Sequence, residues 1–152
     1  MTLLYHATDE ASALSIDQEG FRCGRRGFAG GAIYFSRRPE GACRKYRNGR
    51  GNPDILIECR VNLGMTLTAD IHEVDEQDVH RRGYDSVKID GLDVYAVYEP
   101  QRVKVQNFQR VGRFGFHRSF RTMSALRSER SWFSECHQYM VGLVRWLCGP
   151  ES

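Results

Sequence analysis

Paired cysteines and long apolar runs are both missing from this chain of 152 residues. Its cysteines are odd in number, widely spaced and free of any Cys-x-x-Cys pair: Cys23, Cys43, Cys59, Cys136 and Cys148. This pattern argues against a disulfide framework and against a zinc site, and it favours a reducing compartment. No apolar run reaches the roughly 18 residues that a transmembrane helix requires, so we expect no membrane partner.

A signal peptide and a metal site are also not expected. Residues 1–6 place no basic segment ahead of an apolar one, which is the order that a secretory signal has. Together with the cysteine pattern, this predicts an intracellular protein, either cytoplasmic or nuclear. His72 and His80 are eight residues apart with no supporting motif, so we expect no metal.

The formal net charge of +3 conceals a segregation of charge along the chain. Residues 22–60 hold ten Arg or Lys against three Asp or Glu, whereas residues 70–99 hold nine acidic residues against three basic ones. Nineteen of the 22 basic residues are arginine, which suits bidentate contacts to phosphate. Because arginine suits phosphate, we regard the basic segment 22–60 as a candidate contact for nucleic acid. The alternative explanation is a biased base composition of the gene, which would enrich arginine as well.

The pattern of apolar and turn residues predicts short strands with few helices. We expect strands at 3–7, 32–36, 55–61, 65–69, 85–89, 93–98 and 102–108, and helices at 9–19, 39–46 and 72–81. Asp9 is expected to cap the first helix and Gly20 to close it. Strands and helices do not alternate regularly, which favours an α+β fold over parallel βαβ units.

A histidine and two tyrosines lie where neighbouring elements can bring them into one cleft. His6 ends an apolar strand, Tyr34 lies in an apolar run behind a glycine pair, and Tyr46 lies in the helix that follows. A hydrogen-bonding ring beside two flat aromatic faces suits a ligand with ribose hydroxyls and a planar heterocycle. Histidine and tyrosine at such positions are also common as ordinary packing residues.

Four sequence blocks, in order, resemble the nucleotide-binding core of poly(ADP-ribose) polymerase (PARP)-type ADP-ribosyltransferases. The blocks are His6-Ala7-Thr8, Gly20-Phe21-Arg22, Ala32-Ile33-Tyr34-Phe35 with Tyr46, and Tyr84-Asp85-Ser86-Val87 followed by residues 94–103. The resemblance covers residues 3–106. It implies a PARP-like fold of two packed, mainly antiparallel sheets with short helices and a dinucleotide in the cleft between them. The domain would span residues 1–112.

The resemblance also implies how NAD would be held. His6 would hydrogen-bond a hydroxyl of the adenine ribose, and the backbone of Ala7 would hold the nicotinamide amide in place of the family's glycine. Thr8 retains the hydroxyl of that motif, and Arg22 would reach the pyrophosphate or the adenine.

The two tyrosines would form a clamp. Tyr34 and Tyr46 would stack on both sides of the nicotinamide ring and hold its ribose bond for attack. Three residues before Tyr46, Cys43 stands where the family often offers a serine to the amide.

The third catalytic position departs from the polymerising members, which carry a glutamate there. The alignment puts Val94 in the glutamate's place. Asp93, one residue earlier, would face the other side of a regular strand, unless a bulge near Gly91 returned it to the cleft. The triad His6, Tyr34 and Val94 is similar to that of members that transfer single ADP-ribose units or are inactive. Asp93 stays open as the alternative carboxylate.

The resemblance therefore implies an NAD-dependent mono-ADP-ribosyltransferase, a glycosyltransferase of the pentosyl-transferring kind. NAD would be the donor substrate, and a protein or nucleic acid would accept ADP-ribose as nicotinamide leaves. Two alternatives remain open. One is a catalytically inactive module of the same fold that binds NAD, ADP-ribose or RNA. The other is an RNA 2'-phosphotransferase-like enzyme, favoured if the basic segment 22–60 lines the cleft.

The last forty residues lie outside the resemblance. Residues 113–152 are expected to form a basic linker followed by an amphipathic helix, because apolar side chains recur at helical spacing from Trp132 to Leu147. This helix would pack on the domain or, alternatively, form a surface for a homodimer or another partner.

Overall fold

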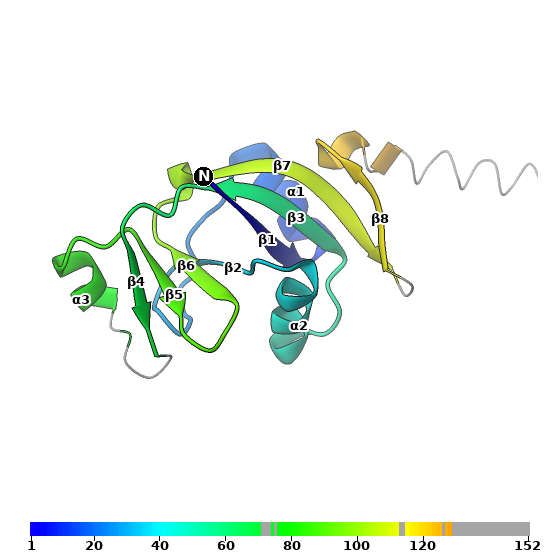
Figure 1. Cartoon of the computed structure of the whole chain (residues 1–152). Coiled ribbons are helices and arrows are strands. Elements are labelled where there is room, and N and C mark those ends of the chain that lie inside the picture. Colours follow the sequence, from blue (N-terminus) through cyan, green and yellow to red (C-terminus); the bar gives the residue numbers. More distant parts are fainter. Residues whose placement is uncertain (71–73, 75, 113–114, 126, 129–152) are drawn as a thin grey trace, which may run out of the picture.

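The computed structural model describes residues 1–70, 74, 76–112, 115–125, 127 and 128. Two four-stranded sheets and short helices make up the fold (Figure 1). The elements run in the order β1 (Thr2–Thr8), α1 (Glu10–Glu19), β2 (Ile33–Phe35), α2 (Pro39–Arg50), β3 (Ile55–Val61), β4 (Thr66–Ala69), α3 (Glu76–Arg81), β5 (Ser86–Ile89), β6 (Val94–Val97), the 3-10 turn η1 (Pro100–Arg102), β7 (Val103–Gly112) and β8 (Gly115–Phe120).

The first sheet has the strand order β1-β3-β7-β8 and is antiparallel throughout. The second has the order β2-β6-β5-β4, in which β4 pairs in parallel with β5 and the other neighbours are antiparallel. Figure 1 shows α1 behind the first sheet, α2 beside the end of β1, and α3 at the outer edge near β4. The expected α+β class with two mainly antiparallel sheets and short helices is confirmed.

The two sheets touch where β1 passes the end of β2. Tyr5 and Ser36 exchange both backbone hydrogen bonds, with N···O distances of 2.8 and 2.9 Å. This bridge holds the next residue of β1, His6, beside β2. The fold therefore brings together two segments that lie about thirty residues apart in the chain.

Strand β6 forms the centre of the packing, because all four of its side chains are buried. Tyr95 and Val97 belong to the larger apolar cluster, which includes Phe35, whereas Val94 and Ala96 belong to a second one. Alternate side chains of a strand point to opposite faces, so β6 has an apolar core on each side.

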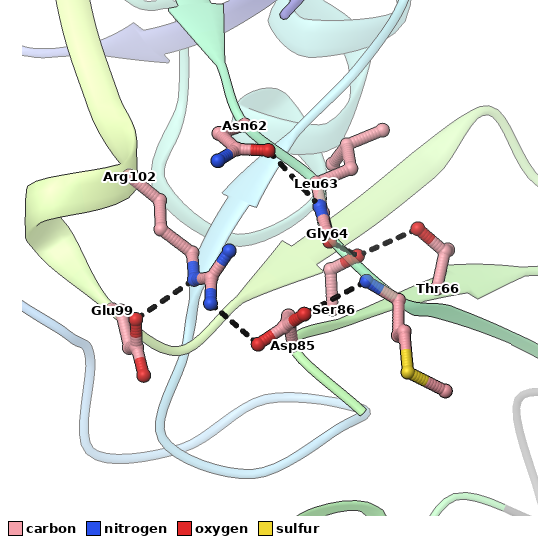
Figure 2. Close-up of polar contacts among 9 residues, drawn as sticks. Asn62, Leu63, Gly64, Thr66, Asp85, Ser86, Glu99 and Arg102 are labelled. Atoms are coloured by element: carbon pink, nitrogen blue, oxygen red, sulfur yellow. Dashed lines mark hydrogen bonds and ion pairs between the residues drawn. The ribbon is translucent and has the colours of Figure 1, made fainter. Parts of the chain in front are cut away.

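A group of polar contacts, called the polar junction here, joins the β3–β4 connection to the start of β5 and to η1 (Figure 2). Its members are Asn62, Leu63, Gly64, Thr66, Asp85, Ser86, Glu99 and Arg102. The Arg102 guanidinium contacts both the Glu99 carboxylate and the Asp85 carboxylate. The second oxygen of Asp85 accepts a hydrogen bond of 2.8 Å from the Met65 amide. Gly64 lies between these groups with φ +56, and a Cβ there would overlap the Asp85 carboxylate. The junction therefore requires glycine at this position for its backbone angle and for its small size.

A buried serine completes the same junction. The Ser86 hydroxyl donates to the Leu63 carbonyl at 2.7 Å and lies 2.9 Å from the Thr66 hydroxyl. The block that contains Asp85 and Ser86 resembles the approach to a catalytic strand, but its polar side chains here tie β5 to the β3–β4 connection.

The local signals for the first helix are confirmed. The Asp9 carboxylate accepts from the Ser12 amide at 2.7 Å, and the Gly20 amide donates to the Ile16 carbonyl at 2.9 Å with φ +81. An aspartate N-cap satisfies an amide that the helix itself leaves unpaired. The second helix begins with Pro39 as expected and continues beyond residue 46 to Arg50.

The chain after residue 112 differs from the expected linker. Residues 115–120 form β8, which pairs with β7 at the edge of the first sheet. Met123 is fully buried in the larger apolar cluster, and its amide donates to the Asp17 carboxylate at 2.9 Å. The described part of the fold thus continues past the expected boundary at 112. The expected helix from Trp132 to Leu147 lies outside the described residues.

Candidate functional site

A cleft of about 500 Å³ opens between β1, α1, β2, α2 and the loop that follows α1. Six of the residues expected to hold NAD line it: His6, Ala7, Thr8, Arg22, Tyr34 and Tyr46. Three expected site residues, Cys43, Asp93 and Val94, do not line it. Arg26 of the glycine-rich loop lines the cleft as well, and so do three residues that the sequence did not predict there: Ser12, Ser15 and Lys45.

His6 is held in a fixed orientation by β2. Its ring Nδ1 lies 2.8 Å from the main-chain carbonyl oxygen of Tyr34. Because a carbonyl oxygen only accepts, Nδ1 carries a proton, and Nε2 of the neutral ring is then an acceptor. The rings of Phe21 and Phe35 meet the imidazole edge to face, with centroids 5.3 and 5.8 Å away. Packing and hydrogen bonding together fix the ring beside the cleft.

The Tyr34 side chain is covered by the glycine-rich loop before β2. Its hydroxyl accepts from the Ala29 amide at 2.9 Å and donates to the Gly30 carbonyl at 2.9 Å. A Cβ at Gly27 would overlap the Tyr34 hydroxyl and ring. The loop can therefore lie this close to the ring only because residue 27 is glycine.

Tyr46 of α2 is held by the residue that caps α1. Its hydroxyl donates to the Asp9 carboxylate at 3.3 Å, and the same carboxylate caps α1. Burial alone would raise the pKa of Asp9, but the hydrogen bonds from Ser12 and Tyr46 outweigh it and lower the pKa. The ionised Asp9 thus links the start of α1 to the tyrosine of α2.

Lys45 comes from α2 and reaches Tyr34. Its Nζ lies 3.9 Å from the centroid of the Tyr34 ring, which is the geometry of a cation–π contact. The Nζ atom is buried and has no hydrogen-bond partner among the described residues. Burial lowers the pKa of Lys45 from its ordinary value to about 7. The sequence offered one signal for this residue, its place directly before Tyr46.

The cleft carries positive charge. Among the described residues, no Asp or Glu lines it, whereas Arg22, Arg26 and Lys45 do. The exposed guanidinium of Arg22 also pairs with Glu19 at 2.9 Å. Three basic residues of the segment 22–60 thus line the cleft, and this placement was the condition for favouring an RNA 2'-phosphotransferase-like enzyme. Arginine and lysine suit phosphate through charge-assisted hydrogen bonds.

The structure places Cys43 beneath the cleft wall. Its side chain is 2% exposed and packs with Ala7, Ala42 and Leu56. Burial raises the pKa of this thiol, so it stays protonated at neutral pH. Cys43 is therefore a packing residue in this arrangement, and it does not replace the serine that the resemblance expects at the amide.

Neither candidate for the third catalytic position lines the cleft, because both side chains make other contacts. The Asp93 carboxylate accepts from the Ser36 hydroxyl at 2.9 Å and from the Arg38 amide at 3.2 Å, beside the start of α2. Val94 is 8% exposed and packs in the second apolar cluster. Tyr34 pairs with Ala96 and packs against this cluster, so Val94 and Tyr34 share one face of the second sheet. The register of β6 is regular from Val94 to Val97, and Asp93 lies just before the first of these pairs.

No protein-family model matches the chain, and no curated protein matches it. Within the described residues, no helix is both long and apolar enough to cross a membrane. No group of three or more potential metal-ligating side chains is found there either. What the cleft offers chemically is a fixed imidazole, hydroxyl groups, an aromatic face and three basic side chains. This set suits a phosphate-bearing ligand that also has hydroxyls and a planar ring.

Proposed function

We propose that the chain has a PARP-like fold, binds NAD in this cleft and transfers single ADP-ribose units to an acceptor that carries its own negative charge. The observation that carries the proposal is the hydrogen bond between His6 and the Tyr34 carbonyl, which joins the two motif residues at the cleft. The order of the four sequence blocks supports the same assignment.

Three parts of NAD would find a complement in the cleft: the pyrophosphate, a ribose hydroxyl and the nicotinamide. Arg22 and Arg26 supply positive charge for the pyrophosphate, and His6 offers a ring nitrogen to a ribose hydroxyl. Tyr34 offers an aromatic face to the nicotinamide, and such stacking contributes on the order of 1 kcal/mol beyond area burial.

The cleft lacks a carboxylate at the third catalytic position, and this limits which groups could accept ADP-ribose. Cleavage of the bond between nicotinamide and ribose builds positive charge on the sugar, as in glycoside hydrolysis. A nearby carboxylate would stabilise that charge, but no acidic side chain lines this cleft among the described residues. An anionic acceptor supplies the charge itself: its oxygen forms the new bond to the anomeric carbon while nicotinamide leaves as a neutral molecule. A protein carboxylate meets this need, and so does a phosphate on a nucleic acid.

A second candidate is a binding module of the same fold without turnover. The position of Lys45 favours it, because the amine lies against the ring face that the nicotinamide would use. The nicotinamide of NAD is itself positively charged, so a protonated Lys45 would repel it. ADP-ribose lacks that ring and avoids the conflict.

Labelled NAD distinguishes these functions. The chain would be incubated with NAD labelled in both the adenylate and the nicotinamide, and protein-bound label and released nicotinamide would be counted. Transfer predicts equal amounts of protein-bound label and released nicotinamide. Both should be lost in Tyr34→Ala, whereas the surface control His80→Ala should keep them. Binding of NAD without nicotinamide release would identify the module. Absence of NAD binding to the folded wild type would overturn the transfer, and absence of binding to both NAD and ADP-ribose would overturn both functions.

A further inference from the structure

Lys45 has no assigned role in the proposed NAD site, although it lies in the cleft wall. Its Nζ is buried and lacks a hydrogen-bond partner among the described residues, and its contact is with the Tyr34 ring. A buried polar group without a hydrogen bond raises the free energy of the folded state. An occupant that engages this amine would remove that cost. The amine therefore points to a ligand group that it can bind.

The surroundings of Lys45 make its amine reactive. Burial lowers the pKa of Lys45 to about 7, so about half of it is neutral at pH 7. The other titratable or charged side chains that line the cleft are Tyr5 and His6 from β1, Tyr34 from β2, Tyr46 from α2, and Arg22 and Arg26 from the loop. None of these is a carboxylate that would keep the amine protonated. A neutral lysine in a dry site is the usual nucleophile for carbonyl compounds.

We propose that Lys45 is a covalent binding site, where its amine forms a Schiff base with the carbonyl carbon of a small phosphorylated aldehyde or ketone. The carbonyl is the electrophile that a neutral amine attacks without any oxidant or metal. The phosphate is the group that Arg22 and Arg26 complement in a cleft lined by no acidic residue among those described. This inference does not depend on NAD turnover.

The chemical step balances without a further reactant. The Nζ lone pair attacks the carbonyl carbon, and one amine proton passes to the carbonyl oxygen to give a carbinolamine. The carbinolamine then loses its hydroxyl group together with the second amine proton as one molecule of water. The product is an imine between Nζ and the former carbonyl carbon, and hydrolysis returns both partners.

Deprotonation also releases the amine from its resting place. The attraction between Nζ and the Tyr34 ring requires the positive charge, so the neutral amine is no longer held there. The flexible lysine stem can then turn Nζ into the adjoining cleft, whose volume of about 500 Å³ admits a compound the size of a phosphorylated sugar. The same proton loss thus makes the amine both mobile and nucleophilic.

The lysine content of the chain provides internal controls. Lys45, Lys88 and Lys104 are its three lysines, and Lys104 is exposed. The whole chain would be treated with pyridoxal 5'-phosphate at pH 7, the imine reduced with cyanoborohydride, and the label at each lysine measured by peptide mapping. Pyridoxal, which lacks the phosphate, would be the parallel probe.

We expect pyridoxal 5'-phosphate to label Lys45 at least about tenfold faster than Lys104, because much more of its amine is neutral. Pyridoxal should label Lys45 more slowly, and Arg26→Gln should reduce the difference between the probes. Lys45→Met should lose the fast label, whereas Lys104→Met should keep it. Equal or faster labelling of Lys104 in the wild type would overturn the site. Equal labelling of Lys45 by both probes would overturn the phosphorylated class of ligand.

Discussion

The imidazole Nδ1 of His6 lies 2.8 Å from the carbonyl oxygen of Tyr34, although the two residues are 28 positions apart in the chain. The Tyr5–Ser36 bridge directly beside them brings their strands into contact. One hydrogen bond therefore links the orientation of the imidazole to the position of the strand that carries the aromatic ring. Any ligand that uses both residues depends on this link.

His6→Ala is expected to lower NAD affinity at least about tenfold while the chain stays folded, since one ligand hydrogen bond and the support of Tyr34 are lost. Calorimetry of wild type, His6→Ala and the surface variant His80→Ala would measure the effect, and circular dichroism would check folding. Equal affinities in all three proteins would remove His6 from the site.

Gly27→Ala is expected to weaken NAD binding with little loss of thermal stability. The new Cβ would overlap the Tyr34 hydroxyl, so either the exposed loop or the ring must move. Gly24→Ala, in the same cleft wall, is the milder comparison, because the atom nearest to its Cβ, the Ala32 carbonyl oxygen, is 3.3 Å away and has to move by only a few tenths of an ångström. If both variants bind NAD like the wild type, the loop does not set the position of Tyr34.

Asp93→Asn is expected to leave any turnover of NAD nearly unchanged. The carboxylate is committed to Ser36 and to the Arg38 amide, and it does not line the cleft. A small loss of stability, about 1 kcal/mol, should follow from the weaker hydrogen bonds at the start of α2. Intact-mass spectrometry after incubation with NAD should show single additions of ADP-ribose. Long chains of ADP-ribose, or loss of all turnover in Asp93→Asn, would make Asp93 the catalytic carboxylate.

Strands β1 to β7 and the first two helices could be predicted from the sequence because their signals are local. Asp9 and Gly20 mark the two ends of α1, and the apolar run around Tyr34 marks β2. Strand β8 was missed because residues 115–120 contain Arg118 and His117 and read as a basic linker. Its place depends on pairing with the edge strand β7, which is a tertiary interaction.

The placement of His6 and Tyr34 at one cleft could be predicted, because each lies in a recognisable motif of its own. It was not predictable for Lys45, whose position depends on how α2 packs against β1 and β2. The hydrogen bonds of Asp93 could not be predicted either, because its partners Ser36 and Arg38 lie more than fifty residues away in the sequence.

Gly64→Ala is expected to lower the free energy of unfolding by about 2–3 kcal/mol, more than Gly91→Ala does. Both glycines have positive φ, +56 and +68, so both variants carry backbone strain. A Cβ at Gly91 meets open space, whereas one at Gly64 displaces Asp85 and Arg102 from the polar junction. Urea denaturation would give the difference between the two variants. Equal losses would show that the junction contributes nothing beyond the glycine backbone angle.

Lys45→Met is expected to stabilise the chain at low pH and to have less effect as the pH rises. The folded pKa of Lys45 is lowered to about 7, so between about pH 7 and 10.4 the unfolded chain binds more protons than the folded one. Stability of the wild type therefore rises with pH across that window. Below it, both states are protonated and the full cost of the buried charge remains, less the attraction to Tyr34.

Methionine has a similar length and no charge, so the variant removes this dependence on pH. At pH 6 its free energy of unfolding, measured with urea, should exceed that of the wild type by roughly 1–3 kcal/mol. Near pH 10 the free energies of unfolding of the two proteins should converge. Lys104→Met, at an exposed position, should track the wild type at every pH. A Lys45→Met variant that is less stable than the wild type by the same amount from pH 6 to pH 10 would mean that the amine is not held in a desolvated place, and the reactive lysine would lose its physical basis.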